Sequence, residues 1–297
     1  MQICRGVFIA PLFLIPTPQP LTEQIVHKAK KKFGQNFLVD EQIIADIISA
    51  IRPEPADNLV EIGPGLGALT RPLLRKLNHL HVVEIDRDII AQLENDYPRG
   101  NPKSKLTIHA GDALEFDLAT LPVPLRIVGN LPYNISSPLL FHFAAYAERI
   151  QDMHFMLQNE VVERMVAEPS TPEYGRLSVM LQSRFHMEKL LDVPPESFRP
   201  SPKVNSAIVR MIPLPTDEIS VRNKELFAAI VKTAFGQRRK TLRNTLRDYL
   251  NESDFMLLGI DAQLRAENLS VADFAKVANY LNEGDVTGRE LSTGKLT

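Results

Sequence analysis

The stretch that decides the fold is LVEIGPGLG, at residues 59–67. Three of its first four residues are apolar, which predicts a short buried strand. Gly63 and Gly65 lie in the turn that follows, where glycine lets the backbone turn tightly and approach a ligand closely. Residues 68–76 then have a helical pattern. Together they predict the strand, glycine turn and helix that begin a nucleotide-binding α/β sheet.

The alternation of strand and helix continues after this unit. Short apolar runs predict further strands at residues 81–85, 106–109 and 127–129, with a helix at residues 88–95. Because buried apolar strands separated by helices pair in parallel, the expected fold is a doubly wound, Rossmann-like α/β sheet. Residues 153–157 and 207–212 are expected to be later strands of the same sheet. The alternative for residues 207–212 is the second strand of a hairpin that closes the sheet.

The second half of the chain changes character at the turn PLPT, residues 213–216. Beyond it the pattern is helical, with helices expected over residues 223–235, 238–250 and 271–281. We therefore expect an α/β domain followed by a small all-helical domain. The expected divisions are a flexible extension at 1–25, the α/β domain at 26–214, the helical domain at 215–283 and a flexible tail at 284–297.

Composition narrows the class of protein. The 297 residues are 44% hydrophobic and 24% charged, as in a globular enzyme, and the net charge is −2, so any nucleic-acid binding must use local positive charge. A single cysteine, Cys4, excludes a disulfide within the chain, and seven scattered histidines give no metal-ligand spacing. No apolar run reaches the ~18 residues that cross a bilayer. We expect no metal, no membrane span and a cytoplasmic location, and we interpret the apolar residues 7–15, interrupted by Pro11, as part of an extension rather than a signal peptide.

The most specific motif directly follows the expected fourth strand: Asn130, Leu131, Pro132 and Tyr133. Open α/β sheets place their ligands at the carboxyl ends of strands. The asparagine oxygen and a main-chain carbonyl near the proline can both accept hydrogen bonds from one planar amine, and the tyrosine ring can stack on a nucleobase. With the glycine turn, this motif predicts methyl transfer to an adenine amine. An Asn-Pro turn with a surface tyrosine is the alternative.

Two acidic residues are candidates for binding a nucleotide-like cofactor. Gly63, Gly65 and Ala68 satisfy the dinucleotide-binding pattern, and Glu84 follows at the end of the second strand, where a carboxylate can accept two ribose hydroxyls. Asp112 follows the third strand and can accept from an adenine amine. The glycine turn alone also fits a nicotinamide enzyme or a tight turn without a ligand, and Asp112 also fits a helix N-cap.

Two basic clusters could contact phosphate. Lys31 and Lys32 end a basic run just before the segment FGQNFL, residues 33–38. A second cluster, on the helix expected over residues 238–250, contains Arg238, Arg239, Lys240, Arg243 and Arg247. In a helix, spacings of three and four would place Arg239, Arg243 and Arg247 on one face, which is suited to phosphate contact. A solvated surface is the alternative for both clusters.

Phe198 begins the proline-stiffened loop FRPSPKV, residues 198–204. Such a loop can hold an aromatic ring rigidly, so Phe198 is a candidate to flank the target base beside Tyr133. A buried phenylalanine that anchors the loop is the alternative.

On these motifs the chain resembles the ribosomal RNA adenine dimethyltransferase family from about residue 27 to about residue 283. The segments that carry the resemblance are KKFGQNFL (31–38), EIGPGLG (61–67), NLPYNIS (130–136), YGRLS (174–178), FRPSPKV (198–204) and QRRKT (237–241). The resemblance implies a Rossmann-like methyltransferase domain with a helical carboxyl-terminal domain, S-adenosylmethionine as methyl donor, and S-adenosylhomocysteine as product.

The substrate implied is a pair of adjacent adenosines in a loop near the 3′ end of small-subunit rRNA, dimethylated within an immature 30S particle. We expect a monomer. Cofactor contacts are implied for Asn36, Leu38, Gly63, Gly65, Glu84, Asp112 and Asn130. The catalytic set is Asn130, Leu131 through its main-chain carbonyl, Pro132, Tyr133 and Phe198, and the rRNA contacts are Lys31, Lys32, Arg238, Arg239, Lys240 and Arg243.

Three alternatives remain at this point. A large-subunit rRNA methyltransferase of the antibiotic-resistance type shares most of these motifs. A dehydrogenase would explain the glycine turn but not the segment from Asn130 to Tyr133. A ribosome-assembly factor that binds without catalysis would need only the basic helical domain.

Overall fold

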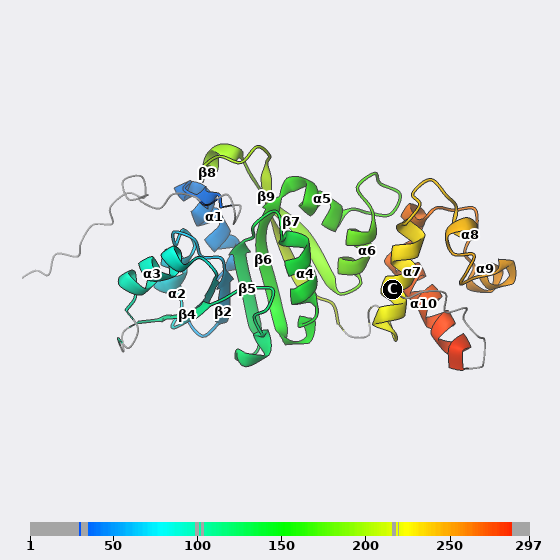
Figure 1. The fold of residues 1–297 in the computed structure, drawn as a ribbon, viewed down its shortest axis with the longest axis horizontal. Helices are drawn as coiled ribbons and strands as arrows, with labels where there is room; N and C mark the ends of the chain where they lie inside the picture. Colours follow the sequence, from blue (N-terminus) through cyan, green and yellow to red (C-terminus); the bar gives the residue numbers. More distant parts are fainter. Residues whose placement is uncertain are drawn as a thin grey trace, which may run out of the picture.

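The computed structural model describes residues 30, 35–98, 101, 104–215, 218 and 220–286. The extension expected over residues 1–25, the site residues Lys31 and Lys32, and the chain after residue 286 lie outside the described residues. Figure 1 shows a sheet with helices on both sides, and a separate group of helices beside it that ends the described chain.

A seven-stranded sheet forms the larger unit. Its strands in spatial order are β4 (Leu106–Ala110), β3 (Leu80–Glu84), β2 (Asn58–Ile62), β5 (Leu125–Asn130), β6 (Ile150–Gln158), β9 (Ser206–Pro213) and β7 (Phe185–Val193). The first five strands are parallel to one another, and β9 is antiparallel to β6 and to β7. The expected Rossmann-like α/β fold is confirmed. Residues 207–212 prove to be the antiparallel partner of two strands.

Strand β7 was not expected, because its sequence FHMEKLLDV does not alternate regularly between apolar and polar residues. Its pairing with β9 contains a register shift between Lys189 and Leu191, which breaks the period of two. A further two-stranded sheet pairs β1 (Phe37–Leu38) with β8 (Phe198–Arg199) and so joins two segments far apart in the sequence.

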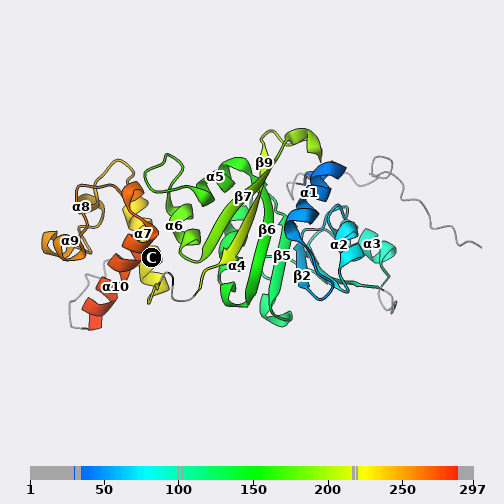
Figure 2. The ribbon, with the colours of Figure 1, turned by 180° about the vertical axis from the view of Figure 1, so that it is seen from behind.

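Six helices accompany the sheet: α1 (Glu41–Ile51), α2 (Thr70–Lys76), α3 (Arg87–Asp96), α4 (Ser136–Ala144), α5 (Asn159–Val166) and α6 (Arg176–Gln182). Helix α1 begins after Asp40, whose carboxylate accepts hydrogen bonds from the first-turn N–H groups of Gln42 and Ile43. Single turns of 3-10 helix lie at Leu118–Thr120, Ala147–Arg149, Pro195–Ser197 and Ala266–Asn268. Helix α4 lies in front of the sheet in Figure 1 and behind it in Figure 2, where the sheet is seen from the other side.

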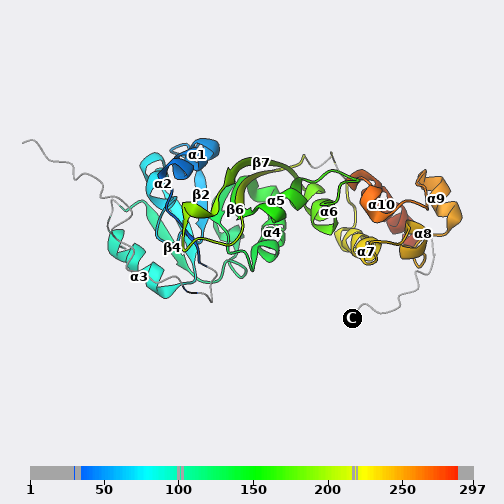
Figure 3. The same ribbon diagram turned by 90° about the horizontal axis from the view of Figure 1, so that it is seen from above.

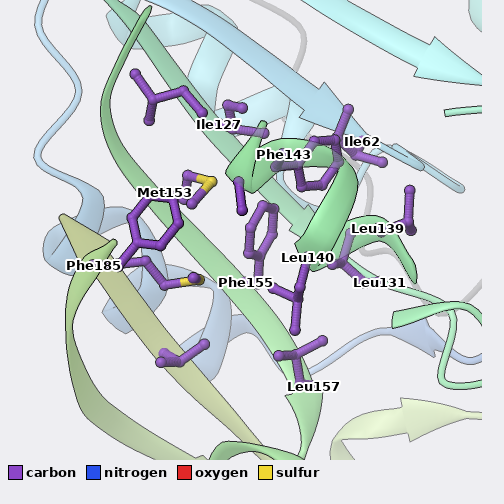
Figure 4. Packing of buried hydrophobic residues seen from close by; sticks show 14 of the residues in the cluster. Ile62, Ile127, Leu131, Leu139, Leu140, Phe143, Met153, Phe155, Leu157 and Phe185 are labelled. Atoms are coloured by element: carbon purple, nitrogen blue, oxygen red, sulfur yellow. The ribbon is translucent and has the colours of Figure 1, made fainter. Parts of the chain in front are cut away.

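Two apolar clusters hold these layers together, one on each face of the sheet. On one face α4 packs on β5 and β6, with the rings of Phe143 and Phe155 stacked 5.4 Å apart (Figure 4). On the other face the buried isoleucines of α1 and Leu73 of α2 pack against β2 and β3. Each buried CH₂ group stabilises the fold by about 0.8 kcal/mol, so these clusters are the main source of stability. They fix the carboxyl ends of the parallel strands, where the site lies.

The helical unit contains α7 (Lys224–Phe235), α8 (Leu242–Thr245), α9 (Glu252–Leu258) and α10 (Val271–Val286), and lies at one end of the molecule (Figure 3). Its core extends back to Ala167, Tyr174 and Val179 of the sheet unit. The Tyr174 hydroxyl also donates to the carbonyl of Leu269 at 3.0 Å. The two units therefore share packed apolar contacts. The division of the chain at residue 215 stays a prediction.

The prediction of a helix over residues 238–250 is wrong. Residues 237–240 form a turn, and only Leu242–Thr245 is helical. The main-chain N–H groups of Leu242 and Arg243 donate to the carbonyls of Leu264 and Ala262 at 2.7 and 3.0 Å, so this segment pairs with a distant loop instead of with its own previous turn. The basic residues therefore do not share one helix face.

Within the described residues, no helix combines the length and the apolar character that a membrane span requires.

Candidate active site

A cavity of about 270 Å³ lies at the carboxyl ends of the parallel strands. It brings together all of the expected cofactor residues and four of the five expected catalytic residues. Those lining it are Asn36, Leu38, Gly63, Gly65, Glu84, Asp112, Asn130, Leu131, Pro132 and Tyr133. They come from five separate segments of the chain, so only the fold assembles them.

The glycine turn forms one wall of the cavity. Gly63 and Gly65 have φ angles of +65° and +52°, a left-handed backbone that residues with a side chain rarely adopt. A Cβ atom on Gly65 would lie 3.2 Å from the Cδ1 atom of Phe37, which is closer than ordinary packing. The turn therefore needs glycine both for its backbone conformation and for the close approach of the segment that carries Asn36 and Leu38.

Glu84 is buried at the end of β3, with 6% of its surface exposed. One carboxylate oxygen accepts hydrogen bonds from the main-chain N–H groups of Ile85 and Asp86, at 2.9 and 2.8 Å. Burial raises the pKa of Glu84, and these N–H groups together with that of Gly65 oppose the rise. The carboxylate is thus held rigidly in the cavity wall and linked to the glycine turn.

Glu61 is a site residue that the sequence analysis did not identify. It lines the cavity from β2, is 2% exposed, and accepts a 2.7 Å hydrogen bond from the Thr70 hydroxyl. Burial raises the pKa of Glu61 to about 7, the Thr70 hydrogen bond lowers it, and the charge of Glu84 raises it further. Within the described residues no basic side chain forms an ion pair with Glu61. The sequence feature that could have identified Glu61 is an acidic residue inside an otherwise apolar strand.

Asp112 lines the cavity, and its side chain accepts a 2.9 Å hydrogen bond from the N–H group of Leu114. Residues 113–115 form a turn and the next helical turn is capped by Asp117, so the helix N-cap interpretation of Asp112 is wrong. A contact of Asp112 with a cofactor stays a prediction.

Asn130 is oriented by the main chain of the amino-terminal segment. Its side-chain Nδ2 donates to the carbonyl of Asn36 at 3.0 Å. The N–H end of the amide is therefore used within the protein, and the Oδ1 atom is the end that can accept from a ligand. This bond also ties residues 35–38 to the end of β5.

Phe198 has no exposed surface and belongs to the apolar cluster beneath α1. It pairs with Leu38 across the small sheet, and the Ser197 carbonyl beside it accepts from the Val39 N–H at 2.8 Å. A ring without exposed surface and outside the cavity lining cannot flank a base in this conformation. We therefore correct the catalytic assignment of Phe198: the ring anchors its loop and the amino-terminal segment, which was the alternative interpretation.

Asp86 is a second residue that the sequence analysis missed. It is 1% exposed and accepts hydrogen bonds from the side chains of Lys30 and Gln35, at 2.6 and 2.9 Å. Burial alone would raise the pKa of Asp86, but the hydrogen bonds from Lys30 and Gln35 outweigh it and hold the pKa below its usual value. Asp86 thus holds the side chains of Lys30 and Gln35, and Gln35 lines the cavity.

Tyr133 lies half-buried in the turn after β5. Its hydroxyl forms a 2.6 Å hydrogen bond with the Ser206 hydroxyl. Burial raises the pKa of Tyr133, so the side chain is neutral at neutral pH.

The basic cluster of the helical unit is only partly available for binding. Arg238 donates to the Pro172 carbonyl and pairs with Glu267, while Arg243 pairs with Glu252 at 2.9 Å. The sequence analysis did not predict that Arg238 and Arg243 bind other residues of the protein. Arg239 and Lys240 are exposed, and in the described part of the chain neither forms an ion pair.

No group of three or more histidine, cysteine or acidic residues among the described residues could hold a metal ion.

Known proteins match most of this chain. The family model described as ribosomal RNA adenine dimethylase matches residues 26–283. The chain is 62% identical over 255 residues to the ribosomal RNA small subunit methyltransferase A of Aromatoleum aromaticum, covering 86% of this chain and 95% of that protein. It is 60% identical over 256 residues to the protein of the same name from Nitrosospira multiformis, covering 86% of this chain and 97% of that one.

Many solved structures match this fold, among them the following two. A dimethyladenosine transferase from Plasmodium falciparum superposes with a TM-score of 0.71 at 25% identity, over 84% of this chain and 98% of the other. The 23S rRNA methyltransferase ErmE superposes with a TM-score of 0.64, also at 25% identity, over 83% and 100%.

Proposed function

Because this chain belongs to the ribosomal RNA adenine dimethylase family, we propose that it dimethylates two adjacent adenosines near the 3′ end of small-subunit rRNA. The methyl groups go to the exocyclic N6 amines, and S-adenosylmethionine is the donor. The observation that carries the proposal is the single cavity that joins the glycine turn to the segment from Asn130 to Tyr133. We further propose that the enzyme acts as a monomer in the cytoplasm, on immature 30S particles.

The cavity fits the proposed cofactor. Gly63 and Gly65 line the cavity without side chains, so a ligand can approach the main chain of the turn closely. Two buried carboxylates, Glu61 and Glu84, face the same cavity, and such groups suit a ligand that carries positive charge and ribose hydroxyls. We assign Gly63 and Gly65 to the amino-acid part, Glu84 to the ribose and Asp112 to the adenine, together with Asn36 and Leu38 as lining residues.

The protein's part in the reaction is positioning. When bound, the cofactor supplies a methyl group that is already electrophilic. The Asn130 side-chain oxygen and the Leu131 carbonyl accept hydrogen bonds from the target amine and direct its lone pair toward the methyl group. Pro132 stiffens this turn, and the Tyr133 ring stacks on the splayed base, as readers of single-stranded RNA generally do. The acceleration comes from orientation and fixed dipoles.

The relatives favour the small-subunit substrate over the large-subunit alternative. The proteins about 60% identical to this chain carry the small-subunit name, whereas the large-subunit enzyme ErmE is 25% identical. The test is incubation of the protein with labelled S-adenosylmethionine and either unmethylated small subunits or large subunits, followed by mapping of the modified nucleotide. Label only in the large subunit would favour the resistance-type activity, and label in neither would favour a binding-only assembly factor.

Cofactor binding is expected to release a proton through Glu61. In the free protein its raised pKa of about 7 leaves the carboxyl partly protonated at neutral pH. A cationic ligand favours the ionised form and lowers this pKa in the complex, so affinity should rise with pH up to about 7 and then level off.

Calorimetry in buffers of different ionisation enthalpy measures this proton release. The ligand's own amino group also titrates, so the quantity of interest is the difference between the parent and Glu61→Gln, which cannot ionise at that position. An identical proton release in both proteins would show that Glu61 does not sense the cofactor charge.

Changing Arg239 and Lys240 together to glutamate is expected to weaken rRNA binding and to leave cofactor affinity unchanged. Both side chains are exposed and far along the chain from the cavity residues. The slope of log affinity against log salt should fall by about 1 to 2, because each lost phosphate contact removes roughly 0.7 to 0.9. Filter binding to small subunits over a salt series measures it.

The matched control is Arg222→Glu with Glu283→Arg, which exchanges an exposed ion pair outside the basic cluster and keeps the net charge. Parental binding by the Arg239 and Lys240 variant would assign this turn to a solvated surface.

A further inference from the structure

Ser206 is buried yet touches the residue proposed to hold the target base. It is 0% exposed, and its hydroxyl forms the 2.6 Å hydrogen bond with the Tyr133 hydroxyl. It begins β9, where it is paired with Gln158 of β6 on one side and Val193 of β7 on the other. The backbone of Ser206 is therefore fixed from both sides by the antiparallel part of the sheet.

Hydrogen bonds to the main chain hold the turn that carries Tyr133. The Leu131 N–H donates to the Met156 carbonyl at 3.1 Å, the Ile135 N–H donates to the Pro132 carbonyl at 3.1 Å, and the Ser136 hydroxyl donates to the Tyr133 carbonyl at 3.2 Å. None of these bonds restrains the torsions of the tyrosine side chain. The hydrogen bond to Ser206 holds the far end of the side chain, so the direction of the ring axis is fixed at the Cα atom and at the hydroxyl.

The two methyl transfers place different demands on this ring. Each transfer forms one N–C bond to the amine, breaks the bond from the cofactor sulfur to the methyl carbon, and releases one amine proton to solvent. Before the first transfer the amine has two N–H groups for two acceptors, Asn130 and the Leu131 carbonyl. Before the second it has one, so one acceptor loses its partner and stacking on Tyr133 contributes a larger share of the alignment.

We infer that Ser206 is a positioning residue that fixes the direction of the Tyr133 ring axis, and with it the place of the ring, and thereby supports the second methyl transfer more than the first. This inference rests on the proposed dimethylation. Ser206 touches neither base nor cofactor in this assignment, and acts only through Tyr133.

Ser206→Ala is expected to slow the second transfer by about two- to tenfold, the range of one net hydrogen bond, and the first transfer by less. The product should therefore shift toward monomethyladenosine. Tyr133→Phe removes the same hydrogen bond by deleting the tyrosine hydroxyl, and it should give the same shift toward monomethyladenosine. The double variant should be no worse than either single one, because both changes remove one shared interaction.

The measurement is a single-turnover time course on unmethylated small subunits, with nucleoside analysis of unmodified, monomethyl and dimethyl adenosine. Ser183→Ala is the matched control, because it removes a serine hydroxyl that donates to the Met180 carbonyl within the same unit but away from Tyr133. Thermal unfolding of every variant separates loss of folding from loss of positioning.

The outcomes are distinguishable. If the parent forms no dimethyladenosine, the proposed function fails. If the parent dimethylates and both single variants give the parental ratio of monomethyl to dimethyl product, the role of Ser206 is refuted. Should Ser206→Ala fail to fold, the ratio given by Tyr133→Phe decides alone. Additive losses in the double variant would also overturn the inference, since they would mean that the two hydroxyls act independently.

Discussion

Glu84→Ala is expected to weaken S-adenosylmethionine binding by roughly 150- to 25,000-fold. A carboxylate that accepts two ribose hydroxyls makes two charge-assisted hydrogen bonds of about 1.5–3 kcal/mol each, and each 1.36 kcal/mol is a factor of ten. The structure adds that the carboxylate is already held by the N–H groups of Ile85 and Asp86, so it is ordered before the ligand arrives. Isothermal calorimetry gives the dissociation constants.

Glu84→Gln is the control that separates the ligand contact from the local fold. It keeps an acceptor oxygen near the same N–H groups, so a smaller loss of affinity is expected than with alanine. Because burial raises the pKa of Glu84, the ionised carboxylate is unfavourable in the free protein, and the glutamine variant should unfold at an unchanged or higher temperature. Parental affinity in the alanine variant would remove Glu84 from the cofactor site.

Tyr133→Ala is expected to lower the rate of methyl transfer by roughly 5- to 150-fold, with little change in cofactor affinity. The range follows from stacking on an aromatic ring, worth ~1–3 kcal/mol per base, and misalignment of the amine adds to it. Truncation at Tyr133 also removes the hydrogen bond to Ser206. Single-turnover rates and cofactor dissociation constants on unmethylated small subunits measure the two effects separately.

Asn130→Ala is the comparison variant in the same experiment. Its side chain holds the Asn36 carbonyl and is assigned to the amine as well, so both cofactor affinity and rate should fall. If Tyr133→Ala methylates at the parental rate, the segment is a structural turn and the base is held elsewhere.

The parallel strands and the glycine turn could be predicted because their signal is local. Each buried strand is a short apolar run, and the turn needs glycine at positions that take a left-handed backbone. The segment from Asn130 to Tyr133 could be placed for the same reason, since it directly follows such a strand. These features belong to consecutive residues, and neighbours in the fold do not change them.

Failures of prediction have a common cause. The helix expected over residues 238–250 gave way to main-chain hydrogen bonds with a loop around residue 263, and the ring of Phe198 was taken into a distant apolar cluster. In both places a partner far along the chain outweighed the local pattern.

The sequence by itself determined the class of fold, the family and ten of the residues that line the cavity, because each is encoded in short runs with their own physical requirement. Only the tertiary structure decided how those residues are held. Glu61 became a buried carboxyl with a raised pKa, Asp86 a partner of Lys30, and Ser206 a partner of Tyr133, because folding brought these pairs together and removed water from around them. Burial and contacts between distant residues are properties of the packed chain, so no local run of sequence specifies them.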